Sequence, residues 1–124
     1  MDEALKKQLE KDPNGLATYE YIVNNIGSSD GIMDELVDKI IAVDKTGQFV
    51  VSTARYLNAI DSSKYAEPIS RLIKVAIEKD REHVYLRDLI ASIWGTDYQE
   101  HVEELSAKDD NFRRIYKRLF PVGM

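Results

Sequence analysis

Apolar residues recur along most of the chain at intervals of three and four, the spacing that predicts short amphipathic helices. Between Leu16 and Ile26, for example, they stand at positions 16, 19, 22, 23 and 26. Segments rich in Gly, Asn, Asp, Ser or Pro, such as 12–15 and 27–31, separate the apolar stretches and predict turns. The pattern predicts seven or eight helices: 2–11, 16–26, 32–44, 49–60, one that starts between 65 and 67 and ends at 79, 81–94, one after Gly95, and a last one that ends before Pro121.

One helix boundary has an alternative. The segment 78–81 contains neither Gly nor Pro, so the fifth and sixth helices could form one continuous helix that ends at Trp94. A helix of about 30 residues would be unusual in a domain of this size. Asp80 is a good N-cap residue, and we therefore expect a break at this position.

The third to sixth helices show internal similarity at a shift of 33 residues. This shift places Ile32, Leu36 and Ile40 on Tyr65, Ile69 and Ile73, and it places Val51, Leu57 and Ile60 on Val84, Ile90 and Ile93. Any two amphipathic helices of equal length align to some degree. The turns nevertheless align together with the apolar positions, since Gly47 falls on Asp80, and this agreement favours a helical-hairpin repeat.

The spacing of Asp44, Phe49, Leu57 and Ile60 resembles the second helix of HEAT and armadillo-type repeats. The segment 67–73, which begins Glu-Pro-Ile, is similar to their first helix, and the resemblance covers about 32–94. Val50 stands where that pattern has an Arg. The resemblance implies a right-handed stack of helix pairs that binds other macromolecules, and it implies no catalytic residues.

We therefore expect one all-α domain, 1–124, built of stacked antiparallel helix pairs, with a non-repetitive helical bundle as the alternative. The first helix and the short last pair would cap the stack. The predicted core consists of Leu36, Ile40, Leu57, Ile60, Ile69, Leu72, Ile73, Leu89, Ile90 and Ile93.

The composition narrows the functional classes. Six Gly and three Pro in 124 residues are too few for a β-sandwich or barrel, and the absence of Cys excludes a disulfide-stapled module and a Cys nucleophile. The formal net charge of −5 argues against a protein that clamps nucleic acid through general basicity. No apolar run approaches the ~18 residues that cross a bilayer, and the N-terminus lacks the order of a signal peptide. We expect a cytoplasmic protein without membrane contact.

The sequence contains no recognisable catalytic constellation. His83 and His101 each follow a Glu, but neither stands in a spacing typical of metal ligands, so we predict no metal and no cofactor. The Gly residues form neither a dinucleotide-binding nor a phosphate-binding pattern. We predict that the protein is not an enzyme. A site assembled from residues far apart in sequence stays open as an alternative.

A mixed apolar and polar strip predicts a binding surface for another protein. On the fourth and sixth helices, Val51, Arg55 and Asn58, and likewise Val84 and Asp88, fall on the side away from the expected core. Together with the repeat and the absence of a catalytic constellation, this strip leads us to expect a non-catalytic protein-interaction module, either a small helical scaffold or an acidic, inhibitor-like binder. The alternative is that both valines pack against a neighbouring helix pair.

The last helix concentrates positive charge. From Lys108 onward there are five basic and two acidic residues, a local charge of +3, which leaves −8 on the first 107 residues. Arg113, Arg114, Lys117 and Arg118 lie opposite the apolar stripe of this helix. They form a candidate site for nucleic acid or a phosphate ligand, although a solvated helix face has the same pattern.

The chain ends in an apolar segment, 119–124, without a charged side chain. This segment either folds back over the last helix pair or meets a second copy of the chain. Folding back is the commoner outcome for a short terminus. We therefore expect a monomer, with a two-fold dimer through the last two helices as the alternative.

Overall fold

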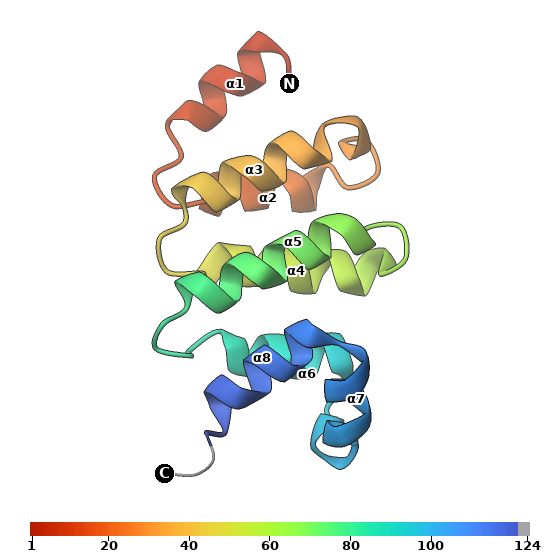
Figure 1. The fold of residues 1–124 in the computed structure, drawn as a ribbon. Helices are drawn as coiled ribbons and strands as arrows, with labels where there is room; N and C mark the ends of the chain where they lie inside the picture. The colour runs from red at the N-terminus through yellow and green to blue at the C-terminus, as the bar shows by residue number, and fades with distance from the viewer. Residues whose placement is uncertain (122–124) are drawn as a thin grey trace.

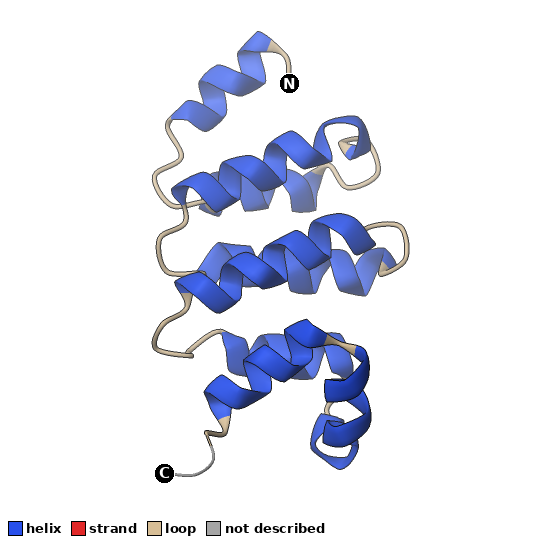
Figure 2. Cartoon of the chain, in the orientation of Figure 1, coloured by secondary structure: helices blue, strands red, loops and turns tan. Residues whose placement is uncertain are grey.

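The computed structural model describes residues 1–121, which are 74% helical and contain no strand (Figure 2). The α-helices are α1 (Glu3–Glu10), α2 (Leu16–Asn24), α3 (Met33–Val43), α4 (Gln48–Asp61), α5 (Ala66–Lys79), α6 (Leu86–Trp94), α7 (Val102–Lys108) and α8 (Asp110–Leu119). Two 3₁₀-helices, η1 (Asp30–Ile32) and η2 (Tyr98–His101), precede α3 and α7. The predicted break between the fifth and sixth helices is confirmed, but α6 begins at Leu86 and not, as predicted, directly after Asp80.

The helices form antiparallel pairs that are stacked in two layers (Figure 1). One layer consists of α2, α4 and α6, and α4 contacts both of its neighbours. The other layer, which lies in front in Figure 1, consists of α3, α5 and α8, with α5 in contact with the other two. Helix α1 lies at the N-terminal end of the stack, and α7 stands at one side. The expected all-α stack of helix pairs is confirmed.

Eight of the ten predicted core residues are buried. They are Leu36, Ile40, Leu57, Ile69, Leu72, Ile73, Leu89 and Ile90. Burying such an aliphatic side chain contributes about 1.5–3 kcal/mol relative to leaving it exposed. This apolar interior therefore provides the main favourable term for stacking the pairs.

The other two predicted core residues are corrected by the structure. Ile60 is 49% exposed, and Ile93 is only partly buried. The buried face of α4 centres on Val50, Ala54 and Leu57, roughly a quarter turn away from the stripe that includes Ile60. Helix α4 contacts α2, α5 and α6, so its wide buried face could not be located from periodicity alone.

A buried aspartate precedes each helix of the α2, α4 and α6 layer. Asp12 accepts hydrogen bonds from the backbone N–H of Gly15 (2.8 Å) and Thr18 (2.9 Å) and from the Thr18 hydroxyl (2.6 Å). Asp44 accepts from the N–H groups of Gly47 (3.0 Å), Phe49 (2.9 Å) and Val50 (2.9 Å). Asp80 accepts from those of Val84 (3.1 Å), Tyr85 (2.7 Å) and Leu86 (2.8 Å). Each carboxylate thus satisfies N–H groups that a helix start leaves free.

These turns give the correct spacing between helix pairs. The aspartates are separated by 32 and then 36 residues, not by the predicted 33. Counted from each aspartate, the sixth residues (Thr18, Val50, Leu86) and the tenth residues (Ile22, Ala54, Ile90) are all fully buried. A shift of 33 misses the second interval by three residues, close to one helical turn, so apolar residues still aligned with apolar residues. The predicted equivalence of Val51 and Val84 is therefore wrong.

Consecutive turns pack against each other along one edge of the stack. Gly47 has a φ of +93°, and a Cβ atom there would lie 3.3 Å from Cβ of Asp80. The Lys79 ammonium group donates to the carbonyl oxygens of Ile41 and Asp44, at the end of α3. The turn before α6 therefore fixes the position of the turn before α4.

His83 occupies the third position after Asp80, where the other two turns have Gly15 and Gly47. It has a φ of +61°, in the left-handed region, and is the only non-glycine residue of 1–121 with a positive φ. This conformation costs an L-residue with a Cβ about 1–2 kcal/mol.

We expect His83→Gly to raise the free energy of unfolding by about 1 kcal/mol, because it removes this strain. Urea unfolding followed by circular dichroism measures the change. His83→Ala keeps the Cβ and should give no gain; an equal gain from both variants would show that the backbone conformation is not the cause.

Asp12 links the stability of the first turn to pH. Burial alone would raise its pKa, but the hydrogen bonds from Thr18, Gly15 and Asn14 together hold the pKa below its ordinary value. A carboxyl whose pKa is lower in the folded state stabilises the fold above its unfolded pKa, and this stabilisation disappears as the pH falls through the folded pKa.

We therefore expect the free energy of unfolding of the wild type to fall more steeply below about pH 4 than that of Asp12→Asn, which cannot ionise. Urea titrations at a series of acidic pH values measure both slopes. Parallel slopes would contradict the role assigned to the Asp12 carboxylate.

Candidate functional site

Helices α2, α4 and α6 together form an open hollow of about 490 Å³. One face of α4 supplies most of its lining, because residues 52, 55, 56 and 59 follow the helical spacing of three and four. Tyr19 contributes from α2 and Ser92 from α6. The lining residues are Tyr19, Ser52, Arg55, Tyr56, Asn58, Ala59 and Ser92.

Two polar side chains of α4 are tied to α6 at this hollow. The Arg55 Nε donates to Oγ of Ser92 at 2.7 Å, and Nδ2 of Asn58 donates to the Ser92 carbonyl oxygen at 3.3 Å. Within residues 1–121, the two terminal amino groups of Arg55 make no hydrogen bond or ion pair. The guanidinium group is thus oriented by a neutral partner and keeps its terminal donors available.

The tyrosines of the hollow are half-buried. The Tyr56 hydroxyl donates to the Val23 carbonyl oxygen at 3.4 Å, and the Tyr19 ring lies 6.3 Å from the Phe49 ring. Half-buried tyrosines combine apolar contact area with a polar group that remains near water. The hollow therefore has an aromatic side on α2 and α4 and a polar side on α4 and α6.

The residues that were predicted to form one partner-binding surface lie in different parts of the structure. Arg55 and Asn58 lie together in the hollow, and Asp88 is exposed one helical turn before Ser92 on α6. Val51 is only 3% exposed, so its assignment to an open surface is wrong; the alternative, packing within the stack, is correct for this residue. Val84 is 54% exposed but lies in the turn before α6, beside a different hollow that also includes Lys45 and Thr46.

Sequence reasoning did not identify Tyr19, Ser52, Tyr56, Ala59 or Ser92 as part of this site. The sequence pattern that could have located the α4 part of the site is the stripe 52, 55, 56 and 59. This stripe combines small, polar and aromatic residues opposite the buried face of α4. Ser92 could not be found in the same way, because the correct register between α4 and α6 depends on the interval from Asp44 to Asp80.

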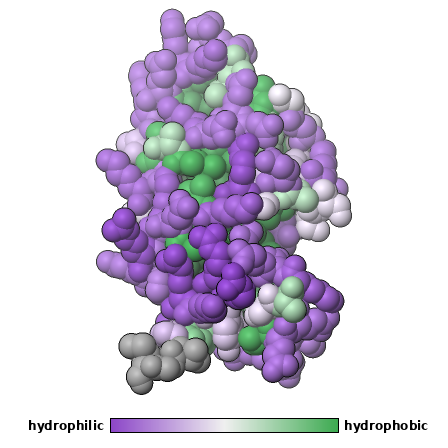
Figure 3. Space-filling model, in the orientation of Figure 1, coloured by the Kyte–Doolittle hydropathy of each residue, from purple (hydrophilic) through white to green (hydrophobic). Residues whose placement is uncertain are grey.

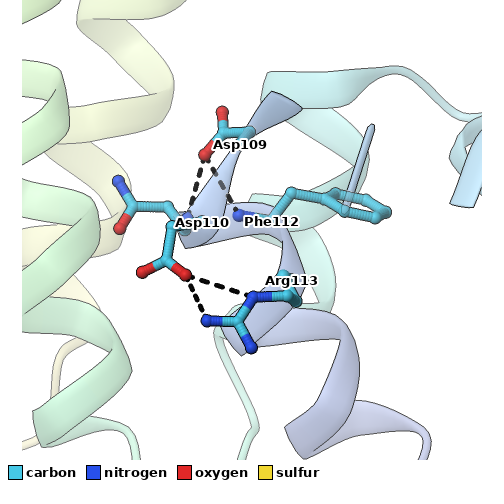
Figure 4. A network of polar contacts seen from close by, with 5 residues as sticks. Asp109, Asp110, Phe112 and Arg113 are labelled. Carbon is cyan, nitrogen blue, oxygen red and sulfur yellow. Dashed lines mark hydrogen bonds and ion pairs between the residues drawn. The ribbon is translucent and has the colours of Figure 1, made fainter. Parts of the chain in front are cut away.

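One of the four basic residues of α8, Arg113, is paired with a carboxylate. Asp109 caps this helix by accepting from the N–H groups of Asn111 (2.9 Å) and Phe112 (3.3 Å), and Asp110 pairs with the Arg113 guanidinium group (Figure 4). The hydrogen bond from Arg113 holds the pKa of Asp110 below its ordinary value. Figure 3 shows that hydrophilic side chains cover most of the face formed by α3, α5 and α8, with patches of hydrophobic side chains among them.

The other three basic residues of α8 have no carboxylate partner among residues 1–121. Lys117 and Arg118 are exposed, and Arg114 is half-buried. The predicted positive strip therefore consists of these three side chains, with Arg113 committed to Asp110.

The two histidines lie in different settings. His83 forms the turn before α6, as described above. His101 lies in η2, where its Nε2 is 3.3 Å from a carboxylate oxygen of Asp97, and ligand atoms of Asp97, Glu100 and His101 all lie within 4.8 Å of one another. The spacing of these residues was not recognised as a possible ligand set. All three are exposed, and within residues 1–121 no other side chain donates a hydrogen bond that would orient them as metal ligands, so we assign no metal to them.

The end of the chain is described as far as Pro121. Leu119 is buried, and the Phe120 ring lies 4.8 Å from the Tyr116 ring. The part of the expected fold-back or dimer contact that falls on 122–124 lies outside the described residues. No helix in residues 1–121 is long and apolar enough to span a membrane.

Comparisons with known proteins identify no relative of this chain. No protein-family model matches it, and neither a curated protein nor a solved structure does. The chemistry of the hollow and of α8 is therefore the basis for assigning a function.

Proposed function

We propose that this protein is a non-catalytic protein-interaction module that binds a segment of a partner protein in the hollow across α2, α4 and α6. The observation that carries the proposal is the hollow itself, about 490 Å³ in volume and lined by all three helices of one layer. Because its walls belong to separate helix pairs, the shape of the hollow depends on how these pairs are stacked.

The residue types in the hollow support this proposal. Tyr and Arg are enriched among residues that dominate the binding energy of protein interfaces. None of the seven lining residues is acidic, although the chain has 22 Asp and Glu. The resemblance to HEAT and armadillo-type repeats, which implies binding of other macromolecules, favours the same function.

Selection of linear peptides from a random phage-displayed library tests the proposal. We expect binders that are blocked by Ala59→Trp, because the indole would occupy the hollow. Ala66→Trp is the matched control: Ala66 is also an exposed alanine, but it lies at the start of α5 in the other layer.

Two outcomes of this selection would contradict the proposal. One is that no peptide is enriched above a library panned on an unrelated protein. The other is that the selected peptides bind the wild type, Ala59→Trp and Ala66→Trp equally well, because the binding surface would then lie outside the hollow.

A second candidate function is binding of nucleic acid or a phosphate ligand by α8. It is favoured by Arg114, Lys117 and Arg118, which have no carboxylate partner within 1–121. Fluorescence anisotropy with a labelled oligonucleotide should then show affinity that falls steeply with salt and is lost in Arg114→Glu with Arg118→Glu. Absence of binding at low salt, or an affinity that salt does not change, would remove this candidate.

A further inference from the structure

We infer that the segment bound in the hollow is an extended peptide that places a carboxylate on the guanidinium group of Arg55. This inference rests on the proposed function, because it concerns the same hollow, and it specifies the chemistry of the partner.

The lining favours an extended segment over a helix. An amphipathic helix docks through its apolar face into an apolar groove, with its own backbone groups already paired. This hollow instead offers the polar side chains of Ser52, Asn58 and Ser92. An extended segment has free backbone N–H and C=O groups that need such partners.

We expect a carboxylate in the partner because most N–H donors of the Arg55 guanidinium group are unused. A guanidinium group has five N–H donors in a planar fork, and only the Nε donor of Arg55 is used, by Ser92. Arg71 and Arg113 are each paired with carboxylates of this chain. Arg114 and Arg118 also have no carboxylate partner within 1–121, but no side-chain hydrogen bond orients them there, whereas Ser92 orients Arg55. The free edge of the Arg55 fork matches a carboxylate, which accepts two parallel N–H bonds from it.

The hydrogen bond from Arg55 to α6 lowers the entropy that is lost when the partner's carboxylate binds. The 2.7 Å hydrogen bond to Ser92 orients the guanidinium group before the partner arrives, so less side-chain freedom is lost on binding. Asp88, one helical turn earlier on α6, disfavours a second acidic residue on that side. The net charge of −5 opposes an acidic partner, and salt screens the contribution of charges that lie farther away than the Debye length of about 8 Å.

A double-mutant cycle tests the inference. The probe is a fluorescein-labelled peptide from the selection described above, together with its twin in which the acidic residue is replaced by its amide. We expect selected peptides to share an acidic position. Either Arg55→Gln or the amide twin should weaken binding about tenfold, and the two changes together should weaken it no further.

Arg81→Gln is the matched control, because it removes the same charge from an exposed arginine outside the hollow; it should leave the affinity unchanged. Ser92→Ala should weaken binding of the acidic peptide but not of its amide twin.

The outcomes separate the inference from the proposed function. If Ala59→Trp blocks binding but the selected peptides share no acidic residue, or the effects of Arg55→Gln and the amide twin simply multiply, the inference is wrong and the proposed function stands. If Ala59→Trp does not block binding, the proposed function fails and the inference fails with it.

Discussion

Replacing Asp44 by alanine should lower the free energy of unfolding by about 3 kcal/mol, because this change leaves several N–H groups at a helix start without a hydrogen-bond acceptor. Asp44 is only 1% exposed, and its carboxylate accepts from four backbone N–H groups, two in the turn and two in the first turn of α4. Removing a buried acceptor leaves such donors without a partner.

Two further variants at aspartates make this prediction specific. Asp44→Asn keeps one acceptor oxygen but turns an amide N–H₂ toward donors, so it should fall between the wild type and Asp44→Ala. Asp61→Ala removes an exposed carboxylate that accepts from one N–H, that of Lys64 at 3.0 Å, and should cost less than about 1 kcal/mol. Equal losses for Asp44→Ala and Asp61→Ala in urea unfolding would refute the role of the buried turn.

Phe112→Ala should cost about 3–5 kcal/mol, the usual range for removing a buried aromatic ring. Phe112 is fully buried in α8, and its ring lies 5.3 Å from that of Trp94 in α6, 6.2 Å from that of Tyr98 and 5.8 Å from that of Tyr116. Its loss leaves a cavity where α8 joins the rest of the stack. Guanidinium chloride unfolding gives the loss of stability.

The fluorescence of Trp94, the only tryptophan of the chain, reports the same change locally. In the folded Phe112→Ala variant its emission should shift to longer wavelength, because the ring that covers the indole is gone. Phe120→Ala removes a half-buried ring and should cost much less. A stability loss below about 1 kcal/mol in Phe112→Ala would show that this ring does not hold α8 in place.

The parts of the fold that local sequence determines could be predicted. Each helix end depends on nearby residues: Gly47 takes the left-handed conformation before α4, Gly95 directly follows α6, and Asp80 separates α5 from α6. The apolar spacing likewise gave most of the core, since a stripe on a helix with one buried face has a single orientation toward the interior.

The orientation of α4 could not be predicted, because it is set by packing. This helix contacts α2, α5 and α6, and apolar residues occur on more than one of its sides. Periodicity therefore placed Ile60 in the core and Val51 at the surface, the reverse of what the structure shows. The interval of 36 residues between Asp44 and Asp80 could not be detected from the apolar pattern either. A shift that is wrong by nearly one helical turn still aligns apolar residues with apolar residues.

The difference between local sequence and packing also explains which residues of the candidate site could be predicted. Arg55 and Asn58 could be predicted as surface residues of α4 from the helical spacing alone. Their contacts with Ser92 depend on how α4 and α6 are aligned, which is a property of the stack. The sequence therefore indicated two of the seven residues that line the hollow, but not Ser92, which orients these two.

Amide chemical-shift mapping by NMR, on titration with a peptide from the library selection, tests most directly whether the hollow is the binding surface. We predict that the shifts concentrate on the lining residues Tyr19, Ser52, Arg55, Tyr56, Asn58, Ala59 and Ser92, with α8 and the α3–α5 face unchanged. Shifts concentrated instead on Arg114, Lys117 and Arg118 of α8, with the hollow unaffected, would contradict the proposed function.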